Sequence, residues 1–212
     1  MGRGLDRRAL SLSLSLSLSL ALMLALGGAA PLRAQTFDLK TLMQRMALRK
    51  AGTARFTEER VVGGIDGPLR SSGTLSFSAP DRFERQNLHP VKETLQIQGR
   101  TLLLRRGGRT RQMDVDAVPE LGALLEALRG TLTGDAALLQ KHFRTQLSGG
   151  EAKWVLLLEP LDARLAQQLA QIEVVGRGSD VHSIALQMRG GDRSLMLLEP
   201  MSTAAAASAS TP

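Results

Sequence analysis

The chain has 212 residues, a formal net charge of +7, no cysteine, no tyrosine and a single tryptophan. The absence of cysteine excludes disulfides and thiolate metal sites. Basic residues are scattered and aromatic residues make up only 3% of the chain, so it lacks the basic stripe or stacking aromatics that nucleic-acid binding requires. We expect no nucleic acid among its partners.

Residues 1–34 predict a secretory signal peptide. Arg3, Arg7 and Arg8 form a basic start, 9–26 is an uncharged run rich in Leu and Ser, and Ala34 offers a small residue for cleavage. A retained membrane anchor is the alternative, because the apolar run approaches the roughly 18–20 residues that span a bilayer. The repeated serines favour cleavage near Ala34, which predicts a periplasmic protein. Without the four arginines and one aspartate of this segment, the formal charge falls from +7 to +4.

Residues 35–200 are predicted to form one domain that begins with a helix over 38–51. Its apolar residues recur at helical spacing, at Leu39, Leu42, Met43 and Met46. Thr36 or Asp38 is suited to cap this helix, and Gly52 is expected to end it.

From Thr53 onward the apolar period changes to two, and turns rich in Gly, Pro and Asp separate short segments. Such closely spaced turns predict antiparallel hairpins. The predicted strands are 54–62, 69–78, 82–88, 92–98, 101–105 and 110–115. In the clearest of them, Leu75 and Phe77 face one side and the neighbouring hydroxyls face the other.

The middle of the chain predicts two helices. The first starts at Pro119 and carries the apolar stripe Leu121, Leu124, Leu125 and Leu128 before Gly130. The second covers 135–141. The remaining elements are predicted strands at 142–148, 151–159, 171–177, 181–189 and 192–198, with a short helix at 162–169. Residues 201–212 are rich in Ala and Ser and are predicted to be a disordered tail.

These elements predict a mostly β member of the α+β class, in which a curved antiparallel sheet has its apolar face covered by short helices. Several strands are rich in Leu, and 154–158 and 195–198 are apolar at nearly every position. Core packing is one interpretation of these leucines. The other is an open sheet whose concave face forms a cavity for an apolar ligand.

The sequence offers no catalytic residue, metal site or cofactor motif. His89, His142 and His182 are far apart and lack the partners of a zinc motif. The turn at 176–180 lacks the Gly-Lys-Ser/Thr of a phosphate loop. We therefore expect a protein that is not an enzyme. The dense basic turn Arg105–Arg111 is either a solvated hairpin or a docking patch for an acidic partner or a lipid headgroup.

Four segments in chain order resemble the outer-membrane lipoprotein carrier family, LolA. They are Phe56–Glu59, the hairpin Ser72–Glu84, the strand Trp154–Pro160 and the closing Gly191–Leu195. The resemblance covers about 38–200. It implies an incomplete β-barrel with a lid of helices, which holds the acyl chains of a lipoprotein in transit through the periplasm.

On this resemblance we expect a monomeric carrier with an inner-membrane donor and an outer-membrane acceptor. Two departures leave the cargo open among a lipoprotein, another lipid and a glycolipid. Ala79 stands where well-known members have an Arg that tethers the lid, and the chain ends in a featureless tail. A lipid-sensing or protein-interaction module on the same fold is the alternative.

The groove and its lid are expected to use fourteen apolar residues: Leu75, Phe77, Leu95, Ile97, Leu102, Leu104, Met113, Leu121, Leu124, Leu125, Leu128, Trp154, Leu156 and Leu158. The segment 119–129 is predicted to be the movable part of this lid.

Overall fold

The computed structural model describes residues 37–115, 125–126, 129–131 and 133–201. The chain divides into two units, Met1–Thr36 and Phe37–Pro212, and every described residue belongs to the second. The predicted signal peptide lies outside the described residues, as does the predicted tail except for Met201. So does most of the predicted lid helix, of which 125, 126 and 129 are described and helical.

Within the described residues, eleven strands form one antiparallel sheet in the order β6-β5-β4-β3-β2-β1-β11-β10-β9-β8-β7. The strands are β1 (Ala51–Val61), β2 (Leu69–Ser78), β3 (Arg82–His89), β4 (Glu93–Gln98), β5 (Thr101–Arg106), β6 (Arg109–Asp114), β7 (Phe143–Gly150), β8 (Lys153–Pro160), β9 (Leu169–Arg177), β10 (Asp180–Met188) and β11 (Arg193–Pro200). The helices with assigned bounds are α2 (Leu39–Ala47), α4 (Ala136–His142) and α5 (Ala163–Gln168).

Two runs of hairpins build this sheet. The first runs outward from β1 to the edge strand β6, and the second returns from the edge strand β7 to β11. They meet where β1 pairs with β11, with Phe56 opposite Leu198. No pairing among the described residues joins β6 to β7, so the sheet is curved and open. This confirms the predicted fold class.

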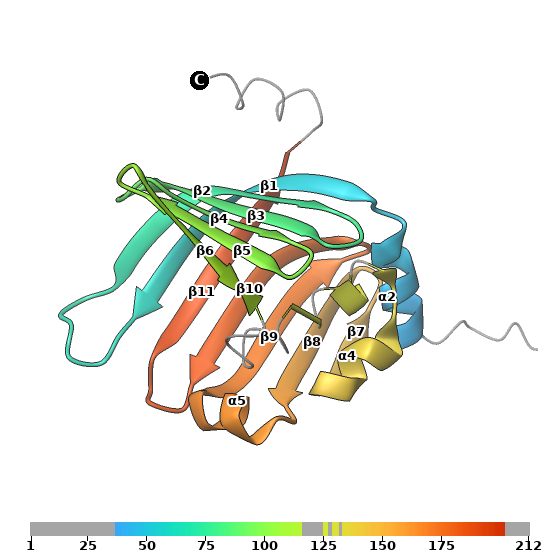
Figure 1. Ribbon diagram of the computed structural model, residues 1–212. Coiled ribbons are helices and arrows are strands. Elements are labelled where there is room, and N and C mark those ends of the chain that lie inside the picture. Colours follow the sequence, from blue (N-terminus) through green and yellow to red (C-terminus); the bar gives the residue numbers. More distant parts are fainter. Residues whose placement is uncertain (1–36, 116–124, 127–128, 132, 202–212) are drawn as a thin grey trace, which may run out of the picture. The chain divides into compact units, whose positions relative to one another are not determined.

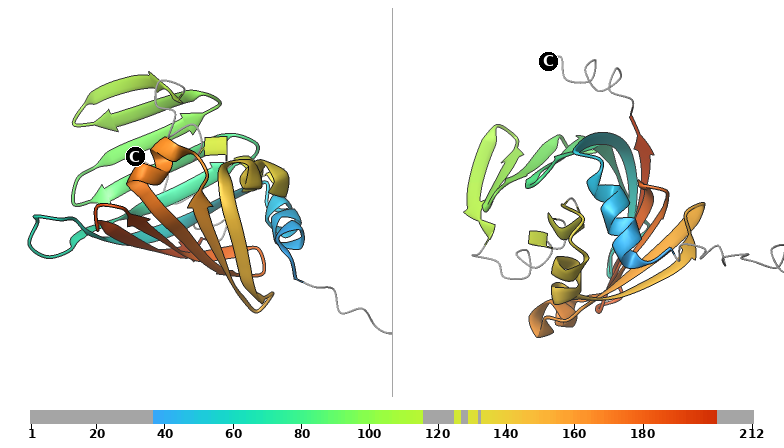
Figure 2. Two further views of the ribbon diagram at one scale, coloured as in Figure 1. Left: turned by 90° about the horizontal axis from the view of Figure 1, so that it is seen from below. Right: turned by 90° about the vertical axis from the view of Figure 1, so that its right-hand side faces the viewer.

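The short helices lie on the concave side of the sheet (Figure 1; Figure 2, right). Asp38 caps α2 by accepting a hydrogen bond from the backbone N–H of Thr41 at 2.8 Å. The buried side chains of α2, Leu42 and Met43, pack against the inner face of the sheet in one apolar cluster with Trp154.

The end of the first helix was predicted wrongly. The helix stops at Ala47, and Ala51 already pairs with Ser78 as the first residue of β1. Gly52 is therefore a strand residue and not a helix terminator. The apolar helical period ends at Met46, and from Ala51 the backbone groups are satisfied by the sheet ladder instead of by further helix.

Candidate functional site: an apolar cavity on the inner face of the sheet

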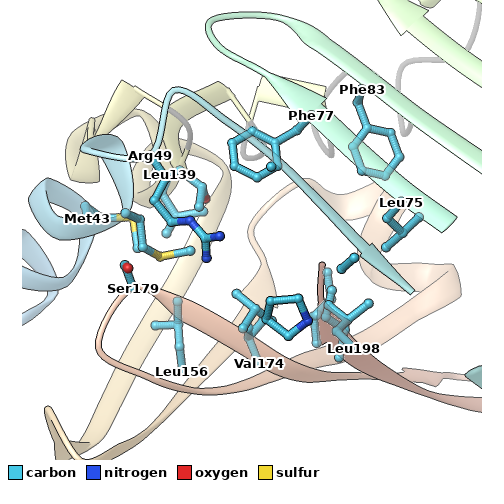
Figure 3. Close-up of a pocket in the computed structure, with 18 of the residues that line it drawn as sticks. Met43, Arg49, Leu75, Phe77, Phe83, Leu139, Leu156, Val174, Ser179 and Leu198 are labelled. Carbon is cyan, nitrogen blue, oxygen red and sulfur yellow. The ribbon is translucent and has the colours of Figure 1, made fainter. Parts of the chain in front are cut away.

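A cavity of about 340 Å³ lies on the concave face, between α2 and the strands of both halves of the sheet (Figure 3). Most of its lining is aliphatic or aromatic, and these side chains are Met43, Met46, Leu75, Phe77, Phe83, Leu139, Phe143, Trp154, Leu156, Leu158, Ile172, Val174, Val181, Ile184 and Leu198. Its size falls within the range of about 300–1,000 Å³ typical of ligand pockets. The lining is suited to hydrocarbon.

The β8 wall of the cavity follows from alternation along one strand. Trp154, Leu156 and Leu158 are 0%, 4% and 7% exposed, because every second side chain of a strand points to the same face. Leu156 pairs with Val174 on β9, which also lines the cavity. The Trp154 indole N–H donates to the Gly178 carbonyl at 3.0 Å, which satisfies the one polar atom of this wall.

The opposite wall depends on a missing side chain. Phe77 lies across Gly52, where an added Cβ would come within 2.7 Å of the Phe77 ring. Leu75 pairs with Ala54, so small residues on β1 leave room for the large ones on β2. In this wall, small residues on β1 therefore lie beside bulky residues on β2.

The third wall comes from α2, α4 and the start of β7. Met43 and Met46 come from α2, and Leu139 and Phe143 come from α4 and the start of β7. Methionine is unbranched and adaptable, which suits a wall that meets ligands of varied shape.

The cavity has one charged side chain among the described residues that line it, Arg49. Arg49 follows α2 and forms an ion pair with Asp180 at the start of β10. Ser179, next to Asp180, also lines the cavity (Figure 3). The apolar space therefore has a polar end, where α2 meets the β9–β10 turn.

A second apolar cluster lies in the half of the sheet that runs from β1 to β6, and we call the two halves its wings. It contains Ile97, Leu102, Val115 and Leu125 as buried residues. Phe83 packs against this cluster and also lines the cavity, so it marks the boundary between the two.

The structure divides the fourteen predicted groove residues among several places. The residues that line the cavity are Leu75, Phe77, Trp154, Leu156 and Leu158. Those that belong to the second cluster are Leu95, Ile97, Leu102, Leu104 and Leu125. Met113 is 41% exposed on the edge strand β6. Leu121, Leu124 and Leu128 lie outside the described residues.

Glu58, 6% exposed, is a buried charged residue on the inner face of the sheet. Arg85 donates to it at 2.6 Å and Ser71 donates at 3.1 Å. Burial alone raises the pKa of Glu58, but the hydrogen bond and charge of Arg85, together with Ser71 and Arg60, outweigh it and lower the pKa below its usual value. The Arg85 guanidinium also lies 4.6 Å from the centre of the Phe56 ring.

The basic turn and the three histidines do not line the cavity, whereas Ser179 of the 176–180 turn does. The basic turn is the β5–β6 hairpin at the edge of the sheet, and its two glycines have positive φ angles. His89 and His182 are exposed. The described residues contain no group of three or more His, Asp or Glu side chains suited to a metal ion. None of the helices in the described part of the chain is long and apolar enough to cross a membrane.

Several lining residues were missed from the sequence. Ile172, Val174 and Ile184 alternate on strands that were predicted, and that alternation was a usable signal for them. Met43 and Met46 were assigned to an ordinary helix stripe. Arg49 carries no local signal, because only the fold brings the α2–β1 link beside the β9–β10 turn.

Comparison with known proteins places the chain in a family. Residues 29–212 match the family described as outer membrane lipoprotein carrier protein LolA-like. The chain belongs to this family, as its sequence motifs predicted. No curated protein sequence is significantly similar to it.

Three solved structures resemble the domain at low identity. A LolA superfamily protein from Nitrosomonas europaea is 8% identical with a TM-score of 0.40, covering 76% of this chain and 91% of that one. A DUF1329 family protein from Desulfovibrio piger is 10% identical, with a TM-score of 0.41 and coverage of 76% and 89%. The lipoprotein LppX from Mycobacterium tuberculosis is 8% identical, with a TM-score of 0.40 and coverage of 76% and 93%.

Proposed function

We propose that this chain is a periplasmic carrier that holds the acyl chains of a lipoprotein or another lipid and moves them towards the outer membrane. One observation carries the proposal: the inner face of the open sheet holds an apolar cavity with one charged residue in its described lining. Membership of the LolA-like family supports the same reading. The role is binding and transfer, without catalysis.

The physical basis is the shielding of hydrocarbon from water. Each buried methylene contributes about 0.8 kcal/mol, so an acyl chain gains much by entering such a cavity. The sheet is open at β6 and β7 within the described residues, and the cavity is walled partly by α2 and α4. The unbranched side chains of Met43 and Met46 allow this wall to adapt to the cargo.

The first test is saturable binding of a nonpolar fluorescent dye to protein purified from an exporting host. Leu198→Trp places a large ring in the cavity, and Leu197→Trp places the same ring on the outer face of the same strand, where Leu197 is 50% exposed. We expect one dye site per chain, lost or much weakened in Leu198→Trp and kept in Leu197→Trp. Equal binding by both variants would place the site elsewhere.

A second test separates a carrier from a lipid sensor. Organic extracts of the protein purified from its native periplasm are analysed by mass spectrometry, and the lipid found is then followed between donor and acceptor vesicles. We expect the protein to accelerate transfer, and Leu198→Trp to reduce that acceleration. Tight binding without accelerated transfer would favour a sensing or protein-interaction module.

A further inference from the structure

Arg49 occupies a position that core packing does not explain. It lies in the link between α2 and β1, and its backbone N–H donates to the Met46 carbonyl at 3.1 Å. Its side chain extends from this link into the cavity, towards the space between Phe77 and Val174 (Figure 3). A solvated arginine at the end of a helix has no need to enter an apolar cavity.

The ion pair with Asp180 orients the Arg49 guanidinium but uses only part of its hydrogen-bonding capacity. The contact runs from Arg49 Nη1 to Asp180 Oδ1, and Asp180 does not line the cavity. The two side chains are 35% and 44% exposed, so the pair is accessible to solvent. A guanidinium has five N–H donors, and among the described residues Asp180 is the one side-chain partner of Arg49. Donors therefore remain for a ligand.

The surroundings of Arg49 match an amphiphile in shape and polarity. The Ser179 hydroxyl lies at the same end of the cavity, and the apolar side chain of Leu156 lies below it in Figure 3. Trp154 contacts the same turn through its hydrogen bond to the Gly178 carbonyl. When an acyl chain fills the apolar part, water leaves the cavity. Charge-assisted hydrogen bonds at its polar end are then stronger than they are in bulk water.

Resting on the proposed function, we propose that the cargo is an acyl lipid with an anionic oxygen headgroup, a carboxylate or a phosphate, and that Arg49 binds this headgroup. The hydrocarbon fills the cavity and the anion lies at the α2 and β9–β10 end. Neutral heads make weaker hydrogen bonds to Arg49, and cationic heads are repelled by it. Arg49 thus selects among lipids of equal chain length.

The test compares ligands that share one saturated chain and differ in the head: a fatty acid, the primary alcohol and the trimethylammonium salt. Each is titrated below its micelle concentration at about pH 8, where the carboxylate is ionised, by displacement of a neutral dye. We expect the wild-type protein to bind the fatty acid about tenfold or more tightly than the alcohol, from the strength of a hydrogen bond between charged groups. The cationic lipid should bind more weakly than either.

Two variants separate headgroup binding from a purely structural ion pair. Arg49→Gln and Asp180→Asn both break the contact, but only Arg49→Gln removes the guanidinium. We expect Arg49→Gln to lose the preference for the fatty acid over the alcohol while it still binds the alcohol. Asp180→Asn should keep that preference or increase it. If both variants change the preference for the fatty acid by the same amount, the proposal is wrong and the role of Arg49 is only to form the ion pair.

The remaining outcomes are also distinct. If the wild-type protein binds the fatty acid and the alcohol equally well, the headgroup proposal is wrong and the carrier function stands. If neither lipid binds, the carrier function itself fails. Acetate alone serves as a control for a free anion site, and acetate that matches the fatty acid in affinity would overturn the assignment to a lipid head. Circular dichroism of each variant verifies that it is folded.

Discussion

Trp154 shows how a single residue sets the shape of the cavity wall. Its ring packs against Gly176 on β9, where an added Cβ would lie 2.2 Å from the ring and 2.3 Å from the Asp180 carbonyl oxygen. The fully buried ring and the hydrogen bond to Gly178 together hold one orientation. We expect blue-shifted Trp154 emission that changes when lipid enters. Emission typical of full exposure, with no response to lipid, would contradict the assigned face of β8.

Substitution of Gly176 tests this packing. We expect Gly176→Ala to lower the free energy of unfolding by about 3 kcal/mol or more, the upper end of the usual cost of overpacking. The reason is that the Trp154 ring and the backbone cannot both move away from the added methyl group. Gly150→Ala is the matched control, since an added Cβ there meets nothing within 4 Å. Urea denaturation followed by circular dichroism measures both variants. Equal stability of the two would show that the Trp154 ring has room to shift.

The buried pair of Glu58 and Arg85 predicts a pH dependence. The pKa of Glu58 is below its ordinary value of 4.5 in the folded protein, so its contribution to stability is present at neutral pH. That contribution is lost as the pH falls from 4.5 through the lower pKa of Glu58 in the folded protein. We expect the stability advantage of the wild type over Glu58→Gln to be full near pH 7 and to shrink as the pH falls below about 4.5. Urea midpoints at each pH measure it, and a constant difference would contradict the assigned ionisation.

At the level of elements, α2 is held by burial more than by charge. Arg45 pairs with Glu151 and Arg49 pairs with Asp180, which connects the helix region to two turns of the sheet. Both pairs are partly exposed, and such pairs contribute little. We expect Glu151→Gln to change stability by less than about 1 kcal/mol, and Met43→Ala, at a fully buried site, to cost about 2–5 kcal/mol. Thermal or urea unfolding compares them, and a larger effect of Glu151→Gln would reverse this ranking.

The helix predicted over 119–129 remains a sequence-based hypothesis as a lid. Among its described residues, Leu125 is 5% exposed and packs in the second cluster with Ile97. We expect faster hydrogen exchange over 117–140 than over β8, with a change when ligand binds. Leu124→Ser with Leu128→Ser should weaken ligand retention more than folding. Global unfolding of that double variant would assign the helix to the fixed core.

At the level of the whole molecule, ligand binding and folding stability are linked. A lipid that binds only the folded state adds about 2.7 kcal/mol of stability at one hundred times its Kd. We expect a concentration-dependent rise in Tm with lipid for the wild type. Leu197→Trp should show the same rise and Leu198→Trp should not. An equal rise in Leu198→Trp would show that the lipid binds outside the cavity.

Much of the fold was readable from local sequence. The Gly, Pro and Asp turns separate segments of alternating polarity, and each such segment predicted a strand that the structure contains. Asp162 and Asp135 cap α5 and α4 as short helices, close to the predicted bounds. The inner faces of β2 and β8 followed from period-two alternation, which is why Leu75 and Trp154 were found. Turn chemistry and side-chain alternation are local properties of the chain.

What the tertiary structure alone decided is which apolar residues enclose space and which fill it. Leu102 and Leu156 lie in similar apolar strand segments and both pack in a cluster, yet only Leu156 of the two also lines the cavity. The difference depends on the curvature of the sheet and on which helix lies over each wing. The pairing of β1 with β11 joins segments about 140 residues apart in the chain, and Arg49 meets Asp180 across a similar separation. Contacts of that range leave no local trace in a single sequence, because they arise from packing and not from the preferences of neighbouring residues.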